Sequence, residues 1–181
     1  MNRDMQSLSL AAALAALLAA PVVTASETPA TAASDVSADA DALSIVATVD
    51  KDEIAAAKQA QGKKLDAGAM DYARMMERDH KSNLDATRAL AKQGGKEMSA
   101  DAKQVHDKNA ATLARIGKLD GAEYQAAYVD AMVKGHTEVL AKLDNELIPN
   151  AKDADVKAHL QKTRTAVSTH LDHAKSLQAA R

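Results

Sequence analysis

The sequence predicts an all-α protein, an antiparallel four-helix bundle with a short extra helix in the crossover. Phe, Trp and Cys are absent, so the core must be built mainly from Ala, Leu, Val, Ile and Met, a composition that favours helices over strands. Apolar residues recur every three or four positions along most of the chain. The segment 72–84 is also echoed at 128–140, with Tyr, Met, His and Leu at the same four positions. Each segment therefore forms one stripe on a helix.

Length and charge limit the classes of function. A chain of 181 residues predicts one domain once an export segment is subtracted. The formal net charge of -2, with acidic and basic residues interspersed, gives no basic patch and argues against nucleic acid as a partner. The absence of cysteine excludes a disulfide framework and a thiolate metal site.

The first 25 residues have the pattern of a secretory signal peptide. Arg3 precedes an apolar run, and Val23-Thr24-Ala25 provides a small-residue cleavage site. The run is shorter than the ~20 residues that a membrane span needs, and a proline interrupts its end. We therefore expect cleavage after Ala25, a periplasmic protein that is free or associated with the outer membrane, and no membrane span in the mature chain.

A disordered linker is expected at residues 26–39, which are rich in Pro, Ala, Ser and Thr and have no apolar period. The helical domain then covers residues 40–181. Its first helix is expected at about 40–61, where Gly62 ends it.

The later helices are bounded by capping and breaking residues. Gly94-Gly95 ends the second helix, Ser99 caps the third and Gly117 ends it, Pro149 closes the fourth, and Asp155 caps the last. Short hairpins join the first helix to the second and the fourth to the last, which makes these pairs antiparallel. The later helices are expected at about 67–93, 100–116, 122–147 and 156–179.

Each long helix places one titratable residue on its apolar stripe, and these four are candidate metal ligands: Glu53, His80, His136 and His170. At ~1.5 Å per residue, counted from the hairpins, the two members of each pair lie within about one helical turn of the same height. They are therefore expected to converge inside the bundle. Glu77 is a further candidate, because its E-x-x-H spacing from His80 puts a carboxylate and an imidazole on one face.

The role of these residues has two interpretations. Di-iron sites in bundles use E-x-x-H twice, but Val133 and Val167 occupy the positions before His136 and His170, so an oxygen-activating iron site is incomplete. Histidines with one carboxylate suit zinc, copper or another transition metal such as iron. Alternatively, these are buried, hydrogen-bonded residues that fix the pairing of the helices.

Three other histidines are weaker candidates. His106 belongs to the crossover helix, whereas His159 and His173 fall off the stripe of the last helix and are expected to be exposed.

Several short motifs between residues 43 and 177 carry a family resemblance. They are Asp52-Glu53-Ile54, Tyr72-Ala73, Met75-Met76, Asp79-His80, Gly121 through Tyr128, Met132-Val133, His136 and Thr169-His170-Leu171. In these the chain resembles the exported bacterial ferritin-like proteins catalogued as domain of unknown function 4142, often labelled outer-membrane or periplasmic proteins. The resemblance implies a ferritin-like bundle and export, and it implies no established activity. The family pattern has an acidic residue before each of the first two histidines; Asp79 fits it, and Gly135 replaces the second.

Three functions are consistent with this sequence. The leading one is a non-enzymatic periplasmic helical-bundle protein with an envelope- or stress-related role. The second is a transition-metal-binding or metal-dependent redox protein with a His/Glu site inside the bundle. The third is a module whose exposed helix face binds an envelope protein. Imidazole nitrogens within ~4–5 Å of one another would favour the metal site, since ligands lie ~2.0–2.1 Å from a shared ion.

Overall fold

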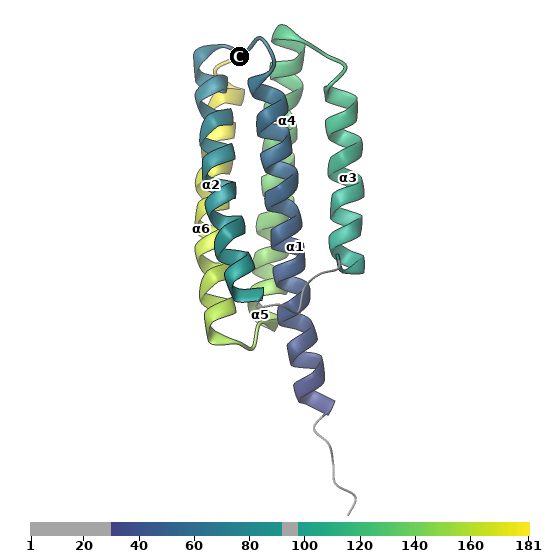
Figure 1. Cartoon of the computed structure of the whole chain (residues 1–181). Helices are drawn as coiled ribbons and strands as arrows, with labels where there is room; N and C mark the ends of the chain where they lie inside the picture. The colour runs from purple at the N-terminus through teal and green to yellow at the C-terminus, as the bar shows by residue number, and fades with distance from the viewer. Residues whose placement is uncertain (1–29, 92–97) are drawn as a thin grey trace, which may run out of the picture.

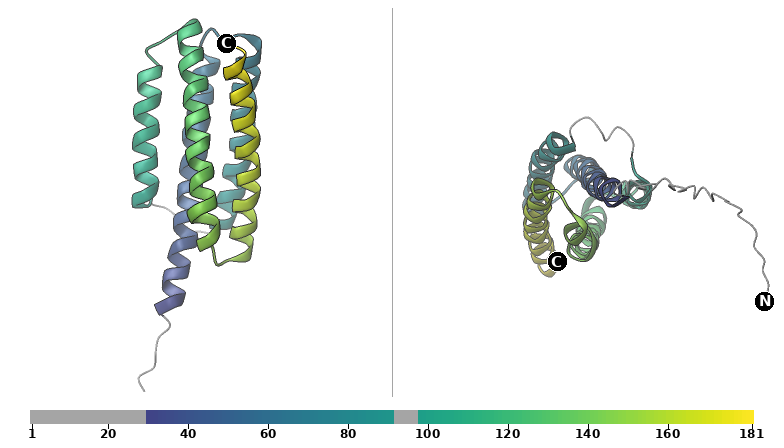
Figure 2. Two further views of the ribbon diagram at one scale, coloured as in Figure 1. Left: turned by 180° about the vertical axis from the view of Figure 1, so that it is seen from behind. Right: turned by 90° about the horizontal axis from the view of Figure 1, so that it is seen from below.

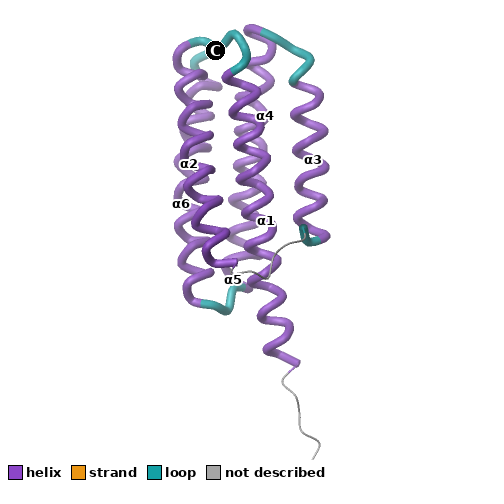
Figure 3. The backbone as a smooth tube through the Cα atoms, in the orientation of Figure 1, coloured by secondary structure: helices purple, strands orange, loops and turns teal. Residues whose placement is uncertain are grey.

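The computed structural model describes residues 30–91 and 98–181, and over these ranges the chain is helical with no strand. The all-α prediction is therefore confirmed (Figure 3). The predicted signal peptide and the predicted stop at Gly94-Gly95 lie outside the described residues. None of the described helices is long and apolar enough to cross a membrane. The elements are α1 Ala30–Gln61, α2 Ala67–Ala91, α3 Ala100–Ile116, α4 Gly121–Lys142, the π-helical turn η1 Leu143–Leu147, α5 Ile148–Asn150 and α6 Ala154–Ala179.

Four helices, α1, α2, α4 and α6, lie side by side along most of their length (Figures 1 and 2). The closest packing joins α1 to α2 and α4 to α6, and α2 also contacts α6. The helix α3 stands outside this group and packs mainly against α1. The result is a helical bundle whose interior is reached by side chains from each of the four long helices.

The first helix starts earlier than the sequence pattern indicated. It begins at Ala30 rather than near residue 40, so residues 30–39 of the segment predicted as a disordered linker are helical. Its contact with the domain includes Asp39, whose carboxylate accepts hydrogen bonds from the backbone N–H groups of Lys152 and Asp153 at 3.0 and 2.9 Å. These bonds tie α1 to the turn before α6, a long-range contact that periodicity does not reveal.

The fourth helix changes geometry near its end. A single helix was predicted to continue to Leu147, but the turn Leu143–Leu147 is π-helical, and the backbone N–H of Ile148 donates to the carbonyl of Leu143. Pro149 explains the change, because its ring has no N–H and would clash with the carbonyl four residues before it in a regular α-helix. Widening this turn lets the chain pass the proline while Leu143 and Leu147 stay buried.

The cap of α6 is Asp153 and not the predicted Asp155. The Asp153 carboxylate accepts hydrogen bonds from the backbone N–H groups of Asp155 and Val156 at 2.8 and 3.1 Å, whereas Asp155 lies in the first turn. Both positions carry an aspartate, so the sequence pattern alone does not separate them.

The cap assignment predicts unequal effects of two matched substitutions. We expect Asp153→Ala to lower the free energy of unfolding by about 1 kcal/mol, because two backbone donors lose their acceptor. Asp155→Ala should lower the free energy of unfolding by only a few tenths of a kcal/mol, the usual effect of a favourable charge in the first turn of a helix. Urea denaturation followed by circular dichroism measures both, and equal losses would contradict the assignment.

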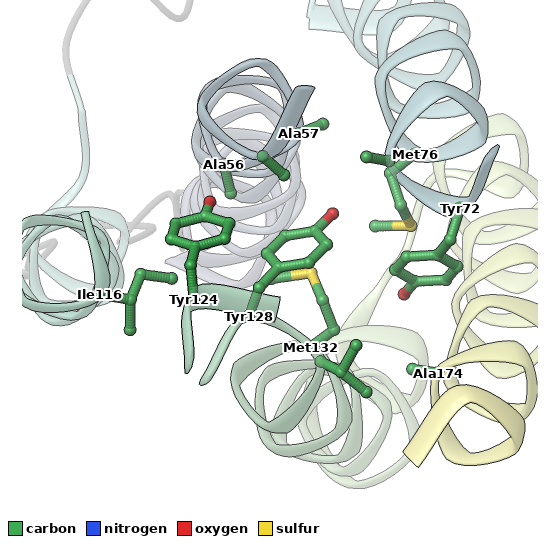
Figure 4. Close-up of a cluster of buried hydrophobic side chains, with 12 residues drawn as sticks. Ala56, Ala57, Tyr72, Met76, Ile116, Tyr124, Tyr128, Met132 and Ala174 are labelled. Carbon is green, nitrogen blue, oxygen red and sulfur yellow. The ribbon is translucent and has the colours of Figure 1, made fainter. Parts of the chain in front are cut away.

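The core has two apolar clusters, one near each end of the bundle. The first contains all three tyrosines, packed with Met76 and Met132 (Figure 4), with the rings of Tyr124 and Tyr128 stacked at 6.0 Å between centroids. The second is aliphatic. Along each long helix, the predicted inward-facing polar residue lies between the stretches that contribute to the two clusters. A polar layer therefore separates two apolar regions. The aliphatic cluster is built around Leu43, Ile45, Val46, Leu143, Leu147 and Leu160.

Candidate metal centre

Three histidines from three helices meet in this polar layer. His80 of α2, His136 of α4 and His170 of α6 are all buried, and one ring nitrogen of each lies within 4.8 Å of one from the others. Their ring centroids are 5.2 to 6.1 Å apart. The convergence expected from the helix stripes is therefore present for the three histidines.

His80 is held by a buried carboxylate. Its Nδ1 lies 2.8 Å from Oδ1 of Asp50, a residue of α1 that is only 1% exposed. The side-chain amide of Asn83 donates to both carboxylate oxygens of Asp50 at 3.2 and 3.0 Å. Its side-chain oxygen accepts a hydrogen bond from the hydroxyl of Thr163 of α6 at 3.0 Å. Because Nδ1 donates its hydrogen bond to the carboxylate of Asp50, Nε2 is the ring nitrogen of His80 that remains available as a ligand.

His136 and His170 are oriented in the same way by other acceptors. The Nδ1 of His136 donates to the backbone carbonyl of Met132 at 2.9 Å, and the Nε2 of His170 lies 3.2 Å from Oδ2 of Asp79. A carbonyl cannot donate, so the Nδ1 of His136 must carry the proton. In each ring, one nitrogen is fixed by an acceptor and the other is free.

The free nitrogens are buried and have no partner in the described part of the chain. They are Nε2 of His80, Nε2 of His136 and Nδ1 of His170. Buried polar atoms are hydrogen-bonded in the great majority of cases, so three unpaired ring nitrogens in one layer require an explanation. Three imidazoles, each with its second nitrogen held by a carboxylate or carbonyl, are the arrangement that proteins use around metal ions.

Glu53 of α1 lies beside the three histidines but outside the group that gathers within 4.8 Å. Its side chain is buried, Oε2 has no partner, and its carboxylate interacts electrostatically with His80 and His170. Burial raises the pKa of Glu53, although the nearby histidines oppose this. A carboxylate in this position is available to a cation.

The same burial affects the histidines differently. Burial, and after it the charge of His80, lowers the pKa of His136 and of His170 to about 4. Burial also lowers the pKa of His80, but the hydrogen bond to Asp50 and the carboxylate of Glu53 outweigh it and raise the pKa above its ordinary value. His136 and His170 are thus neutral at pH 7, the state in which imidazole binds metals.

Glu77 does not take part in this group. Although it lies one turn before His80, its carboxylate accepts hydrogen bonds from Lys81 at 2.6 Å and from Gln61 at 2.7 Å. These two bonds lower the pKa of Glu77. Despite the E-x-x-H spacing, the contacts with Gln61 of α1 and with Lys81 hold the carboxylate of Glu77 outside the histidine group.

The other histidines lie in three different settings. His106 is half-buried and its Nδ1 lies 2.8 Å from Oδ1 of Asp52. The prediction that His173 is exposed is confirmed, but the same prediction for His159 is wrong. His159 is buried and its Nε2 lies 2.8 Å from the hydroxyl of Thr87, because α6 packs against α2 as well as α4 and therefore buries a wider face than one stripe.

Sequence reasoning missed two residues that support the centre. Asp50 and Asn83 were not singled out, yet together they hold His80. A signal was present, because Asp50 lies three residues before Glu53 and Asn83 three residues after His80, each on the same helix face as its neighbour.

A model of a protein family described as Domain of unknown function (DUF4142) matches residues 24–177. The chain belongs to this family. The matched range of the DUF4142 domain includes Glu53 and all three histidines of the centre. No curated protein and no solved structure matches the chain. The function of this DUF4142 domain must therefore be argued from its own geometry.

Gly135 of the DUF4142 domain occupies the position before His136 where the resemblance led us to expect an acidic residue. A Cβ built on Gly135 would lie 3.9 Å from Oε1 of Glu53, so an acidic side chain there would extend beside this carboxylate. With glycine at this position, α4 places no carboxylate beside Glu53 there.

Proposed function

We propose that this DUF4142 domain binds one transition-metal ion through His80, His136 and His170, with Glu53 as the fourth ligand. The observation that carries the proposal is the set of unpaired, buried atoms: one nitrogen from each ring and Oε2 of Glu53. A layer that served only to pair the helices would satisfy these atoms among themselves. A single metal ion would bind all four of these atoms at once.

The ligand set favours zinc or copper. Three imidazoles, each of which binds a metal in its neutral form, and one carboxylate match the nitrogen and oxygen donors that these ions take at ~2.0–2.2 Å. The nitrogens, now within 4.8 Å of one another, need to move by only several tenths of an ångström to reach a shared ion. A second ion has no comparable ligands here, because Glu77 is engaged by Lys81 and Gln61.

The arrangement also supports the finer proposal of a ferritin-like bundle. Each of α1, α2, α4 and α6 contributes one ligand from its inner face, which is how bundles of this type build metal sites. The activity proposed is metal binding; three histidines and one glutamate lack the carboxylate-rich ligands of the oxygen-activating di-iron bundles.

Metal content is the direct test of this proposal. We expect untagged protein, purified from its native compartment, to contain about one zinc or copper ion per chain, as measured by inductively coupled plasma mass spectrometry. The variant His136→Ala, which removes one of the three proposed imidazole ligands, should contain far less. A wild-type protein without metal that also fails to take up added zinc would refute the proposal.

We further propose that the protein is exported to the periplasm. The support is the pattern of Arg3, the apolar run and Val23-Thr24-Ala25. The expected result is a mature chain that starts at Ser26, measured by N-terminal sequencing of protein from the periplasmic fraction. Recovery of a chain starting at Met1 from the cytoplasm would contradict export.

A further inference from the structure

A cavity of about 320 Å³ opens beside the histidine layer, between α1, α3, the end of α4 with η1, and α6. The cavity is open to solvent on one side, where the exposed residues Lys108 and Glu138 line it. An apolar cavity of ~150 Å³ is large enough to bind benzene, so this one has room for roughly ten non-hydrogen atoms.

The wall of the cavity is mainly aliphatic. Such a surface offers few hydrogen bonds to water, which makes an apolar occupant more favourable than a filling of solvent. The side chains that define this wall include Ile45, Val46, Val49, Val139, Leu143 and Leu147.

The polar end of the cavity lies at the histidine layer. Glu53 and His80 both line it. Each also has a buried atom without a hydrogen-bond partner, Oε2 and Nε2 respectively. Lys108 and Lys142 also line the cavity, but their ammonium groups are engaged in ion pairs, Lys108 with Glu138 and Lys142 with Glu146 at 2.7 Å. The occupant therefore has an aliphatic body and a polar head directed at the centre.

We propose that this cavity binds a medium-chain aliphatic carboxylate. Its aliphatic chain would lie against the wall of the cavity, and its carboxylate would be the fifth ligand of the metal ion that the three histidines and Glu53 hold. The contact of the head rests on the proposed function. A divalent ion with neutral imidazoles and one glutamate keeps a positive charge, and a carboxylate supplies an anionic oxygen without first losing a proton.

The probe is octanoate, measured by titration calorimetry with zinc-loaded and metal-free protein. Zinc-loaded wild type should bind octanoate, and removal of zinc should weaken binding about tenfold or more, since a lost contact to a charged group is worth at least one decade in Kd. Zinc binding is measured separately in every sample, so failure of the metal site is seen independently of octanoate.

Two matched substitutions on α4 test whether the aliphatic chain of octanoate lies in the cavity. Val139→Phe fills the cavity, whereas Val133→Phe makes the same change at a half-buried position that does not line it. Val139→Phe should weaken octanoate binding about tenfold or more, and Val133→Phe should leave it unchanged. Val139→Leu adds less volume and should give an intermediate loss. Melting curves and retained zinc binding verify that each variant is folded.

Three results are decisive against the proposal or part of it. Zinc-loaded protein that does not bind octanoate overturns it and leaves the metal site standing. Octanoate binding that is the same in Val139→Phe as in wild type also overturns it, because the carboxylate then binds elsewhere. A third result is that zinc does not bind but Val139→Phe still abolishes octanoate binding. The metal site and the contact of the octanoate carboxylate with the ion are then both refuted, and only the position of the aliphatic chain in the cavity is supported.

Discussion

Zinc should raise the melting temperature of chelator-treated protein by about 5–10 °C when its free concentration is a hundredfold above Kd. A ligand that binds only the folded state adds about 2.7 kcal/mol to the free energy of unfolding at that excess, and a domain of this size gains about 2–4 °C per kcal/mol. The binding must come from the folded state, because the ligands run from Glu53 to His170 and only packing brings them together. Differential scanning calorimetry with and without zinc measures the shift.

Variants of the ligands and a matched histidine control define this result. His136→Ala should abolish the zinc-dependent rise, whereas His106→Ala should retain it, because His106 pairs with Asp52 outside the histidine layer. His159 is not a suitable control, since its burial makes its replacement costly for the fold. Glu53→Gln keeps the side-chain volume and should weaken zinc binding while the metal-free protein stays folded. An equal rise in wild type and in His136→Ala would place the zinc elsewhere.

The metal-free protein should lose stability as the pH falls from about 6.5 to about 4. For His136 and His170 the folded pKa is about 4, below the unfolded value of 6.5, so the unfolded chain binds protons in this window and the folded protein does not. Their contribution is present above the unfolded pKa and is lost toward acid. A displacement of this size corresponds to roughly 3 kcal/mol for each histidine, and the two do not add fully because His80 affects both.

Two neighbouring groups also titrate, but only Glu53 opposes this loss between pH 6.5 and 4. The pKa of His80 is raised, so its contribution is fully present below the unfolded pKa and is lost only as pH rises through the folded one. The pKa of Glu53 is raised by burial, so its folded form gains a proton first as the pH falls, which stabilises. Urea denaturation at a series of pH values should therefore give a steeper acid loss in Glu53→Gln and a shallower one in His136→Gln. A flat wild-type profile between pH 6.5 and 4 would contradict burial of neutral histidines.

Helical periodicity was enough to find the three histidines, and it was not enough to find what holds them. The stripe on each helix puts His80, His136 and His170 inward, and the short hairpins bring them to similar heights. Glu77 has the right spacing on the same helix, but a partner on α1, Gln61, and its neighbour Lys81 draw its carboxylate away. Residue spacing along one helix predicts which side chains share a face. Which partners these side chains bind depends on contacts with other helices, which spacing does not reveal.

The features that escaped the sequence all depend on contacts between distant segments. Asp39 ties α1 to the turn before α6 by accepting two backbone hydrogen bonds from that turn. His159 is buried because α6 has two neighbours, α2 and α4. The π-helical turn before Pro149 keeps Leu143 and Leu147 inside. By contrast, the cap at Ser99 and the stop at Gly117 were predicted correctly, because both are local.

A metal ion in the polar layer would act as a removable cross-link in a chain that has no cysteine to form a permanent one. The layer lies between the tyrosine cluster and the aliphatic cluster, and the four ligands proposed for the ion come from four separate helices. With the ion in place, neither end of the bundle opens without losing a shared ligand, so amide exchange at both ends should slow together. Because proteases cleave the opened chain, the lifetime of the protein then depends on the free metal concentration around it.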